Sequence, residues 1–181
     1  MSSKNWRKNH SVIQQLSDAP HNFSFFQTVR LLERAAVLKN IESESNALET
    51  QCAVNPVASF MPPNSEVLRF HSHNALIFSN SPIEKIKHIK NHGNLFQWKM
   101  QVNFMGINGT NSVLPYHYTE LILRRLKEKD NSLLNFFDVF NHRLISLFYQ
   151  AGSKYFLPIA YERQKLQPNK NNMPDLSLIH I

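Results

Sequence analysis

Two pairs of histidines have a spacing that could bring imidazole rings together. His71 and His73 are two residues apart, which places both side chains on one face of a strand. His88 and His92 are four residues apart, which places both on one face of a helix. Either pair could donate two ligands to a metal ion such as zinc. Because neither pair comes with a recognisable third and fourth ligand, we expect no metal site.

A carboxylate and an imidazole also have a spacing that suits proton transfer. Asp138 and His142 are four residues apart, so on a helix the carboxylate could orient the ring for acid–base work. No nucleophile accompanies them, and the chain lacks the nucleophile elbow, the HExxH helix, the Walker loop and the dinucleotide fingerprint. The GINGTNS segment at 106–112 lacks the Gly-Lys-Ser/Thr of a phosphate-binding loop and predicts a turn. We therefore expect a protein that is not an enzyme and has no cofactor.

The charge of the chain bears on its partners. A formal net charge of +7 over 181 residues attracts nucleic acid or an acidic protein surface. Acidic residues are interspersed among the lysines and arginines of the segments 84–90 and 120–130, so we interpret these runs as solvated faces and expect no nucleic-acid partner. A basic nucleic-acid binding module is the alternative hypothesis, which Trp6, Arg7 and Lys8 also favour.

Composition indicates one globular domain. The chain is 42% hydrophobic, no apolar run reaches the roughly 20 residues that span a bilayer, and no signal sequence precedes the first element. We expect a cytoplasmic protein without membrane insertion. The single cysteine, Cys52, can form neither an internal disulfide nor a structural zinc site, and we expect it to be a small buried side chain.

The first element that would position these residues is an amphipathic helix. Ser24 and Gln27 have the spacing of a capping box, so the helix is expected to begin near Ser24. Its polar face carries Gln27, Arg30 and Arg34. Its apolar face carries Phe25, Phe26, Val29, Leu32 and Ala36. The segments 39–50 and 54–66 lack periodicity or contain prolines, and we expect connections there.

Short strands follow. The segments Leu68–Phe70 and Leu76–Phe78 predict a strand pair. From Phe96 to Phe104 apolar and polar residues alternate without a break, which predicts a strand with one buried face. Such alternation is typical of an antiparallel or edge position. We therefore expect a small, mainly antiparallel sheet.

A loop and two helices complete the pattern. Gly106 and Gly109 allow backbone angles that other residues avoid, and Pro115 suits the first turn of a helix. One helix carries Tyr118, Leu121, Ile122 and Leu126 on one side. The next runs from about Leu133 to Ala151 and is expected to end at Gly152.

The last helix is apolar on two sides. We expect its more aromatic side to face the core of the domain, with Phe136, Phe137, Phe140, Leu144 and Phe148. The opposite side is then a candidate partner surface, although both sides could instead be interior. With two arginines of the first helix, the candidates for partner contact are Leu134, Ile145, Tyr149, His142, Arg30 and Arg34.

These elements define an α+β fold with an amphipathic N-terminal helix, a small mainly antiparallel sheet and a C-terminal helical pair. We expect a flexible segment at 1–21, one domain at 22–161 and a polar tail or linker at 162–181.

Three blocks of the sequence together resemble the TssG family, which are baseplate subunits of the bacterial type VI secretion system. They are FSFFQTVRLLER at 23–34, FMGINGTNSVLPYHYTE at 104–120 and DNSLLNFFDVFNHRLISLFYQAGSKY at 130–155. With the weaker EVLRF block, the resemblance covers most of residues 23–155. The family usually has a glycine where this chain has Ser112. Family members continue further, so the resemblance implies an N-terminal portion, with SLIHI at 177–181 possibly foreign to the gene.

The resemblance implies a scaffolding role in the baseplate wedge. One TssG-like subunit is held there by two TssF-like subunits and contacts a TssK-like adaptor and a TssE-like sheath initiator, so that tube and sheath can assemble. This implies assembly at the cytoplasmic face of the inner membrane. The family offers no catalytic residue to carry over.

Overall fold

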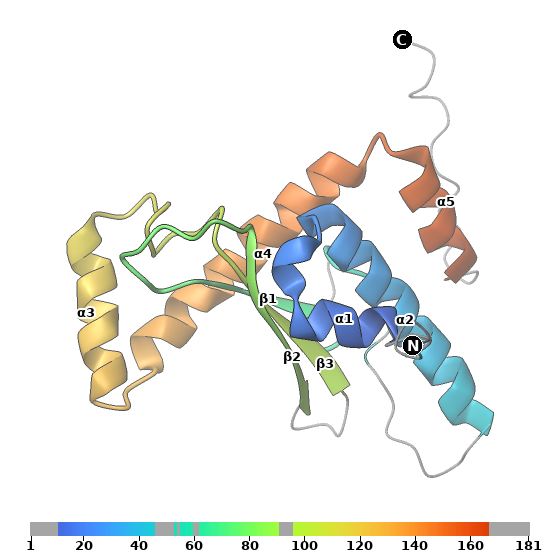
Figure 1. Cartoon of the computed structure of the whole chain (residues 1–181), viewed down its shortest axis with the longest axis horizontal. Coiled ribbons are helices and arrows are strands. Elements are labelled where there is room, and N and C mark those ends of the chain that lie inside the picture. Colours follow the sequence, from blue (N-terminus) through green and yellow to red (C-terminus); the bar gives the residue numbers. More distant parts are fainter. Residues whose placement is uncertain (1–10, 46–52, 54, 60–61, 91–95, 167–181) are drawn as a thin grey trace, which may run out of the picture.

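The computed structural model describes residues 11–45, 53, 55–59, 62–90 and 96–166. Figure 1 shows a small sheet with two helices on one side and a long helix beside it. The elements in chain order are α1 Val12–Asp18, α2 Phe25–Ser45, β1 Leu68–Ser72, β2 Ile83–Lys90, β3 Phe96–Val102, α3 Tyr116–Lys127, α4 Ser132–Ser153 and α5 Leu157–Leu166. The predicted α+β class, the N-terminal helix and the C-terminal helices are confirmed.

The sheet is mixed, with the strand order β1-β3-β2. The alternating segment forms β3 as predicted. Of the two positions that the alternation favoured, β3 has the antiparallel one, through its pairing with β2, and it is not at the edge because it is the central strand. β3 pairs in parallel with β1, where Leu68 lies opposite Trp98, and antiparallel with β2, where Lys87 lies opposite Lys99. A central strand can keep one polar face here because α1 and α2 pack on the other face of the sheet.

The partner strand predicted at Leu76–Phe78 is not formed, since this segment is an exposed bend. β2 lies further along the chain, in a segment that we interpreted as a solvated polar run. Its lysines at 85 and 87 alternate with Ile86, whose side chain is buried in the core. The polar appearance of β2 reflects one solvated face of the sheet.

The core lies between one face of the sheet and the helices. From the N-terminal half it receives Leu16 of α1 and Val29 and Leu32 of α2. From the sheet it receives Leu68, Phe70, Ile83, Ile86, Trp98, Met100 and Val102. Removing a large side chain from water stabilises a fold by about 1.5–3 kcal/mol, so this cluster carries most of the packing energy.

Helical structure occurs in three places where the sequence predicted none. The structure contains α1, which starts with a capping box at Ser11, inside the segment that we expected to be flexible. Ser24 accepts a hydrogen bond from the Gln27 amide as predicted, and α2 then continues to Ser45 through residues expected to be a connection. α5 reaches Leu166, inside the expected polar tail. Residues 1–10 and 167–181 lie outside the described part of the chain.

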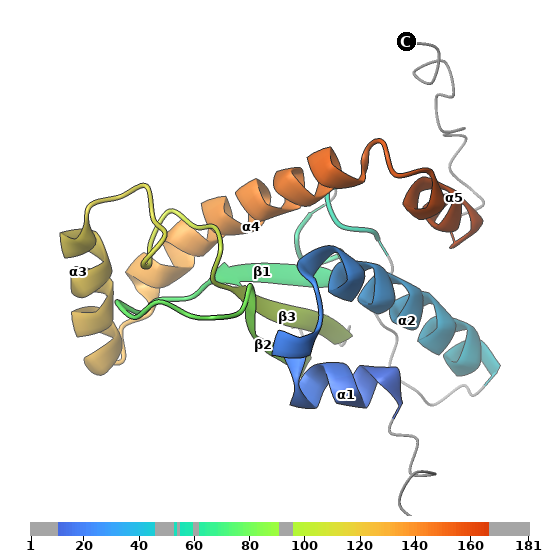
Figure 2. The same ribbon diagram turned by 45° about the horizontal axis from the view of Figure 1, so that its top comes forward.

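α4 runs along the outer edge of β1 (Figure 2). At this edge the Phe70 amide donates a hydrogen bond to Nδ1 of His142 at 3.2 Å. Edge strands have backbone N–H groups without a partner strand, and His142 takes the place of that partner here. Near its end, α4 packs closely on α2: a Cβ placed on Gly152 would lie 2.5 Å from the Phe26 ring. Gly152 therefore permits close packing and does not end the helix, which continues to Ser153.

Candidate protein interface

The side of α4 that faces the sheet is polar, and its groups are paired with residues far away in the sequence. Nδ1 of His71 on β1 lies 2.6 Å from a carboxylate oxygen of Asp138. Nε2 of His142 lies 3.3 Å from a carboxylate oxygen of Glu66. The predicted partnership between Asp138 and His142 is therefore wrong, because each of them turns to a different residue near β1.

Burial determines the protonation of this polar layer. Burial lowers the pKa of His71, and the hydrogen bond that its ring donates to the Asp138 carboxylate offsets this only in part. Burial also raises the pKa of Tyr149, with a further contribution from the charge of Glu33. Both side chains are therefore held in their neutral forms near pH 7. Such groups position α4 against the sheet.

Asn141 joins α4 to the loop before α3. Its side-chain oxygen accepts from the Ile107 amide at 2.8 Å, and its nitrogen donates to Oδ1 of Asn108 at 2.7 Å. In the same loop Gly109 has φ of 109°, as its sequence position predicts, and its amide donates to Thr119 of α3. These bonds hold the GINGTNS segment as a structural turn.

His71 and His73 do not come together as a ligand pair. His73 lies 3.9 Å from Glu84, apart from the pairing of His71 with Asp138. His88 lies on a strand, where its ring stacks on Phe96 with centroids 4.6 Å apart. His92 and Cys52 lie outside the described residues. Within the described ranges, no three histidine, cysteine, aspartate or glutamate side chains are grouped as metal ligands.

The expected assignment of the two apolar sides of α4 is wrong. Ile145 and Tyr149 are 0% exposed and belong to the core, and His142 is also buried. Leu134 is partly buried. These four candidates face the sheet because the polar residues between them find partners there. Ile145, Tyr149 and His142 are therefore not exposed to a partner in this structure, whereas Leu134 keeps part of its surface accessible.

The side of α4 that we expected to be core is largely open to solvent, and of its residues only Phe137 is partly buried. We call it the aromatic face, and it comprises Phe136, Phe140, Leu144, Leu147 and Phe148. Phe140, for example, is 46% exposed.

The aromatic face is a preformed surface. The rings of Phe136 and Phe140 pack edge to face with centroids 5.2 Å apart. At the other end, the Phe148 ring lies 5.4 Å from that of Phe104 and 5.8 Å from that of Phe26. Rings held by neighbours lose little entropy when a partner covers them.

Further exposed apolar side chains lie beside both ends of α4. Those on α3 are Tyr116, Tyr118 and Leu121. Those on the link to α5 and on α5 itself are Tyr155, Phe156, Leu157 and Tyr161. Many exposed large apolar side chains on neighbouring elements are typical of a protein that binds another protein.

The two arginine candidates lie where α2 meets α5. Arg30 donates two hydrogen bonds to the Glu162 carboxylate, one of them 2.6 Å from Nε. Nη1 of Arg34 is 3.7 Å from the same carboxylate. Deeper in this contact, Arg163 donates to the Glu33 carboxylate. Arg30 therefore joins two helices of its own chain.

The polar groups of α4 are paired internally, and one apolar face of α4 is open to solvent. This combination is typical of assembly proteins, which act through surfaces that bind other proteins. Comparison with known families agrees with this class. The family model described as "Type VI secretion, TssG" matches residues 19–178, and the chain belongs to this family. It is a structural component of the type VI secretion baseplate.

Neither a comparison with curated proteins nor one with solved structures found a match. Within the described residues, none of the helices has both the length and the apolar character needed to cross a bilayer.

Proposed function

We propose that the aromatic face of α4 is the surface through which this baseplate subunit binds a TssF-like subunit. In this proposal two TssF-like subunits hold one copy of the chain, which also contacts a TssK-like adaptor and a TssE-like sheath initiator. The assembly lies at the cytoplasmic face of the inner membrane. The exposure of five large apolar side chains along one side of α4 is the observation that carries the proposal.

The energy available at this face suits an obligate contact. Each of its side chains retains 38–58% of its exposed surface. Covering the remaining surface contributes on the order of 1 kcal/mol per side chain, given about 1.5–3 kcal/mol for complete burial. Aromatic anchors at the centre of an interface commonly supply most of the binding energy. Arg34, which is exposed beside α5, is a proposed contact at the rim.

Charged substitutions on the aromatic face test the proposal. The double variant Phe140→Glu with Leu147→Glu is expected to lose co-purification with a TssF-like partner, because two carboxylates would be buried without partners. Asn135→Glu is the matched control, since this exposed residue of α4 lies outside the aromatic face. Circular dichroism and the melting temperature should be the same for all three proteins.

Unchanged co-purification of the double variant, with its fold intact, would refute the role of the aromatic face. Charged substitutions at Ile145 or Tyr149 are not suitable for this test. Both side chains are fully buried, so loss of binding there would report loss of the fold.

A further inference from the structure

The face of the sheet opposite the core is strongly basic. The strand register places Arg69 of β1 opposite Lys99 of β3, and Lys99 opposite Lys87 of β2. One row of three cations therefore crosses the whole sheet. Lys85 lies two residues before Lys87 and points to the same face. We call Arg69, Lys85, Lys87 and Lys99 the basic row.

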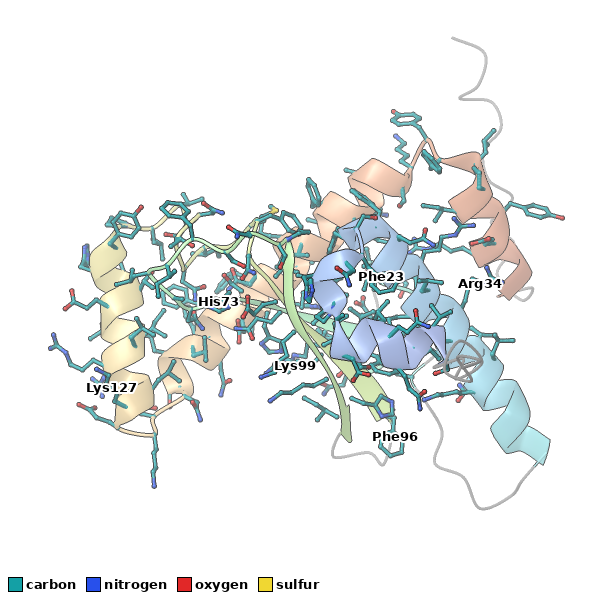
Figure 3. The ribbon with its side chains drawn as sticks, in the orientation of Figure 1. Phe23, Arg34, His73, Phe96, Lys99 and Lys127 are labelled. Carbon is teal, nitrogen blue, oxygen red and sulfur yellow. The ribbon has the colours of Figure 1, made fainter. Side chains whose placement is uncertain are left out.

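A cavity of about 310 Å³ lies on this face, where α4 passes the sheet. In Figure 3 Lys99 lies on the side of the strands away from α1. Three cations of the basic row line the cavity, namely Lys85, Lys87 and Lys99. Other lining side chains are Gln101 and Ile89 of the sheet and Leu134 of α4.

The cations of the basic row form no ion pair with a carboxylate among the residues that the structure describes. Arg69, which does not line the cavity, donates to the Asn64 side chain, and no ion pair is formed by the lysines at 85, 87 and 99. Asp138 also lines the cavity, but its carboxylate is engaged by His71. Nε2 of His71 is buried without a hydrogen-bond partner in the described part of the chain.

Electrostatics makes this arrangement unfavourable in the free protein. Like charges directly opposite each other on neighbouring strands repel. Partial burial lowers the pKa of Lys99, and the charges of Arg69 and Lys87 lower it further, with Asp138 acting in the opposite direction. An anion in the cavity would relieve both the repulsion and the cost of burying the ammonium group.

We propose that this cavity binds aspartate or glutamate side chains of an acidic segment on a partner protein. The proposal rests on the proposed function, because the ligand belongs to another subunit, but the surface is separate from the aromatic face. A carboxylate fits a cavity of this size, and Ile89 and Leu134 give it apolar walls for the rest of a side chain. Nucleic acid fits less well, because no exposed aromatic side chain lines the cavity for stacking on bases.

The test uses a fluorescein-labelled oligoglutamate peptide and fluorescence anisotropy at low ionic strength. The double variant Lys87→Gln with Lys99→Gln is expected to weaken peptide binding by about tenfold or more, because it removes two close charge contacts. The control is Arg124→Gln with Lys127→Gln, which changes the net charge equally on α3. Figure 3 shows Lys127 well away from Lys99. Binding by the control is expected to stay within about twofold of the original.

Three results would overturn the inference. They are no peptide binding at low salt, equal weakening in both double variants, or an oligothymidylate that binds the cavity more tightly than the peptide. Co-purification with the TssF-like partner, measured on the same variants, separates the two proposals. Because the two surfaces are separate, the variant Lys87→Gln with Lys99→Gln is expected to lose peptide binding and to keep co-purification. Failure of the aromatic-face variants to affect co-purification refutes only the proposed function.

Discussion

Arg163 on α5 makes the ion pair whose removal is expected to cost this fold most. Its Nε lies 3.0 Å from the Glu33 carboxylate, and its Nη2 also donates to the Val57 carbonyl oxygen. Its guanidinium lies over the Tyr149 ring, 5.0 Å from the centroid. Arg163→Ala therefore removes the partner of a buried carboxylate and a contact with the core.

The magnitude follows from burial. The side chain of Glu33 is 7% exposed and that of Arg163 is 24% exposed. Breaking a fully buried pair costs about 3–5 kcal/mol, and water near Arg163 reduces the expected loss to about 2–4 kcal/mol. The Val57 amide still donates to Glu33, which prevents complete loss of its hydrogen bonds.

The chain contains a matched control in the same contact. Arg30 also joins α2 to α5, but its side chain and that of Glu162 are 28% and 27% exposed. Arg30→Ala is expected to cost no more than about 1 kcal/mol, as more solvated pairs do. Urea unfolding followed by tryptophan fluorescence would report both values, since Trp98 lies in the core.

Equal losses in the two alanine variants would refute the reasoning, because burial would then not govern the energies of these pairs. A second check is the double variant Glu33→Gln with Arg163→Met, which removes both charges. It is expected to be more stable than Arg163→Ala, since no buried carboxylate is left unpaired.

Two further predictions concern α4 and its contacts. At an unhindered helix position, Gly→Ala stabilises a protein by about 1 kcal/mol through helix propensity. In Gly152→Ala the new methyl group would have to displace the Phe26 ring, which costs about 1–3 kcal/mol of folding free energy. We expect a lower melting temperature, and a rise would contradict the close packing. Because His71 has a lowered pKa in the fold, the unfolded chain binds a proton at His71 first as the pH falls below about 6.5. Stability is therefore expected to fall between pH 7.5 and 5.5, less steeply in His71→Gln, and an equal fall would exclude His71 as the cause.

Local signals predicted the elements that depend on nearby residues. The alternation from Phe96 onward identified β3, because a strand with one buried face has a period of two. Ser24 identified the start of α2 through its bond to the Gln27 amide. Gly109 was expected to have an unusual backbone angle, and it does. In each case the cause lies within a few residues.

The pairing of β1 with β3 could not be predicted in this way. A parallel pair joins segments about thirty residues apart, and nothing near β1 or β3 specifies that contact. β2 was missed for a related reason. Its lysines lie exposed on the sheet face opposite the core, so the pattern of β2 resembles that of a solvated run.

The orientation of α4 shows most clearly what the sequence could determine. By itself, the sequence determined that this helix has two apolar sides, the family to which the chain is similar and the absence of a recognisable catalytic motif. Hydrophobicity alone then favoured burial of the more aromatic side. Only the tertiary structure decided the opposite orientation, because Asp138 and His142 obtain partners from His71 and Glu66, which are distant in the sequence. A polar group can be buried when it is paired, and that pairing left the aromatic face available to another protein.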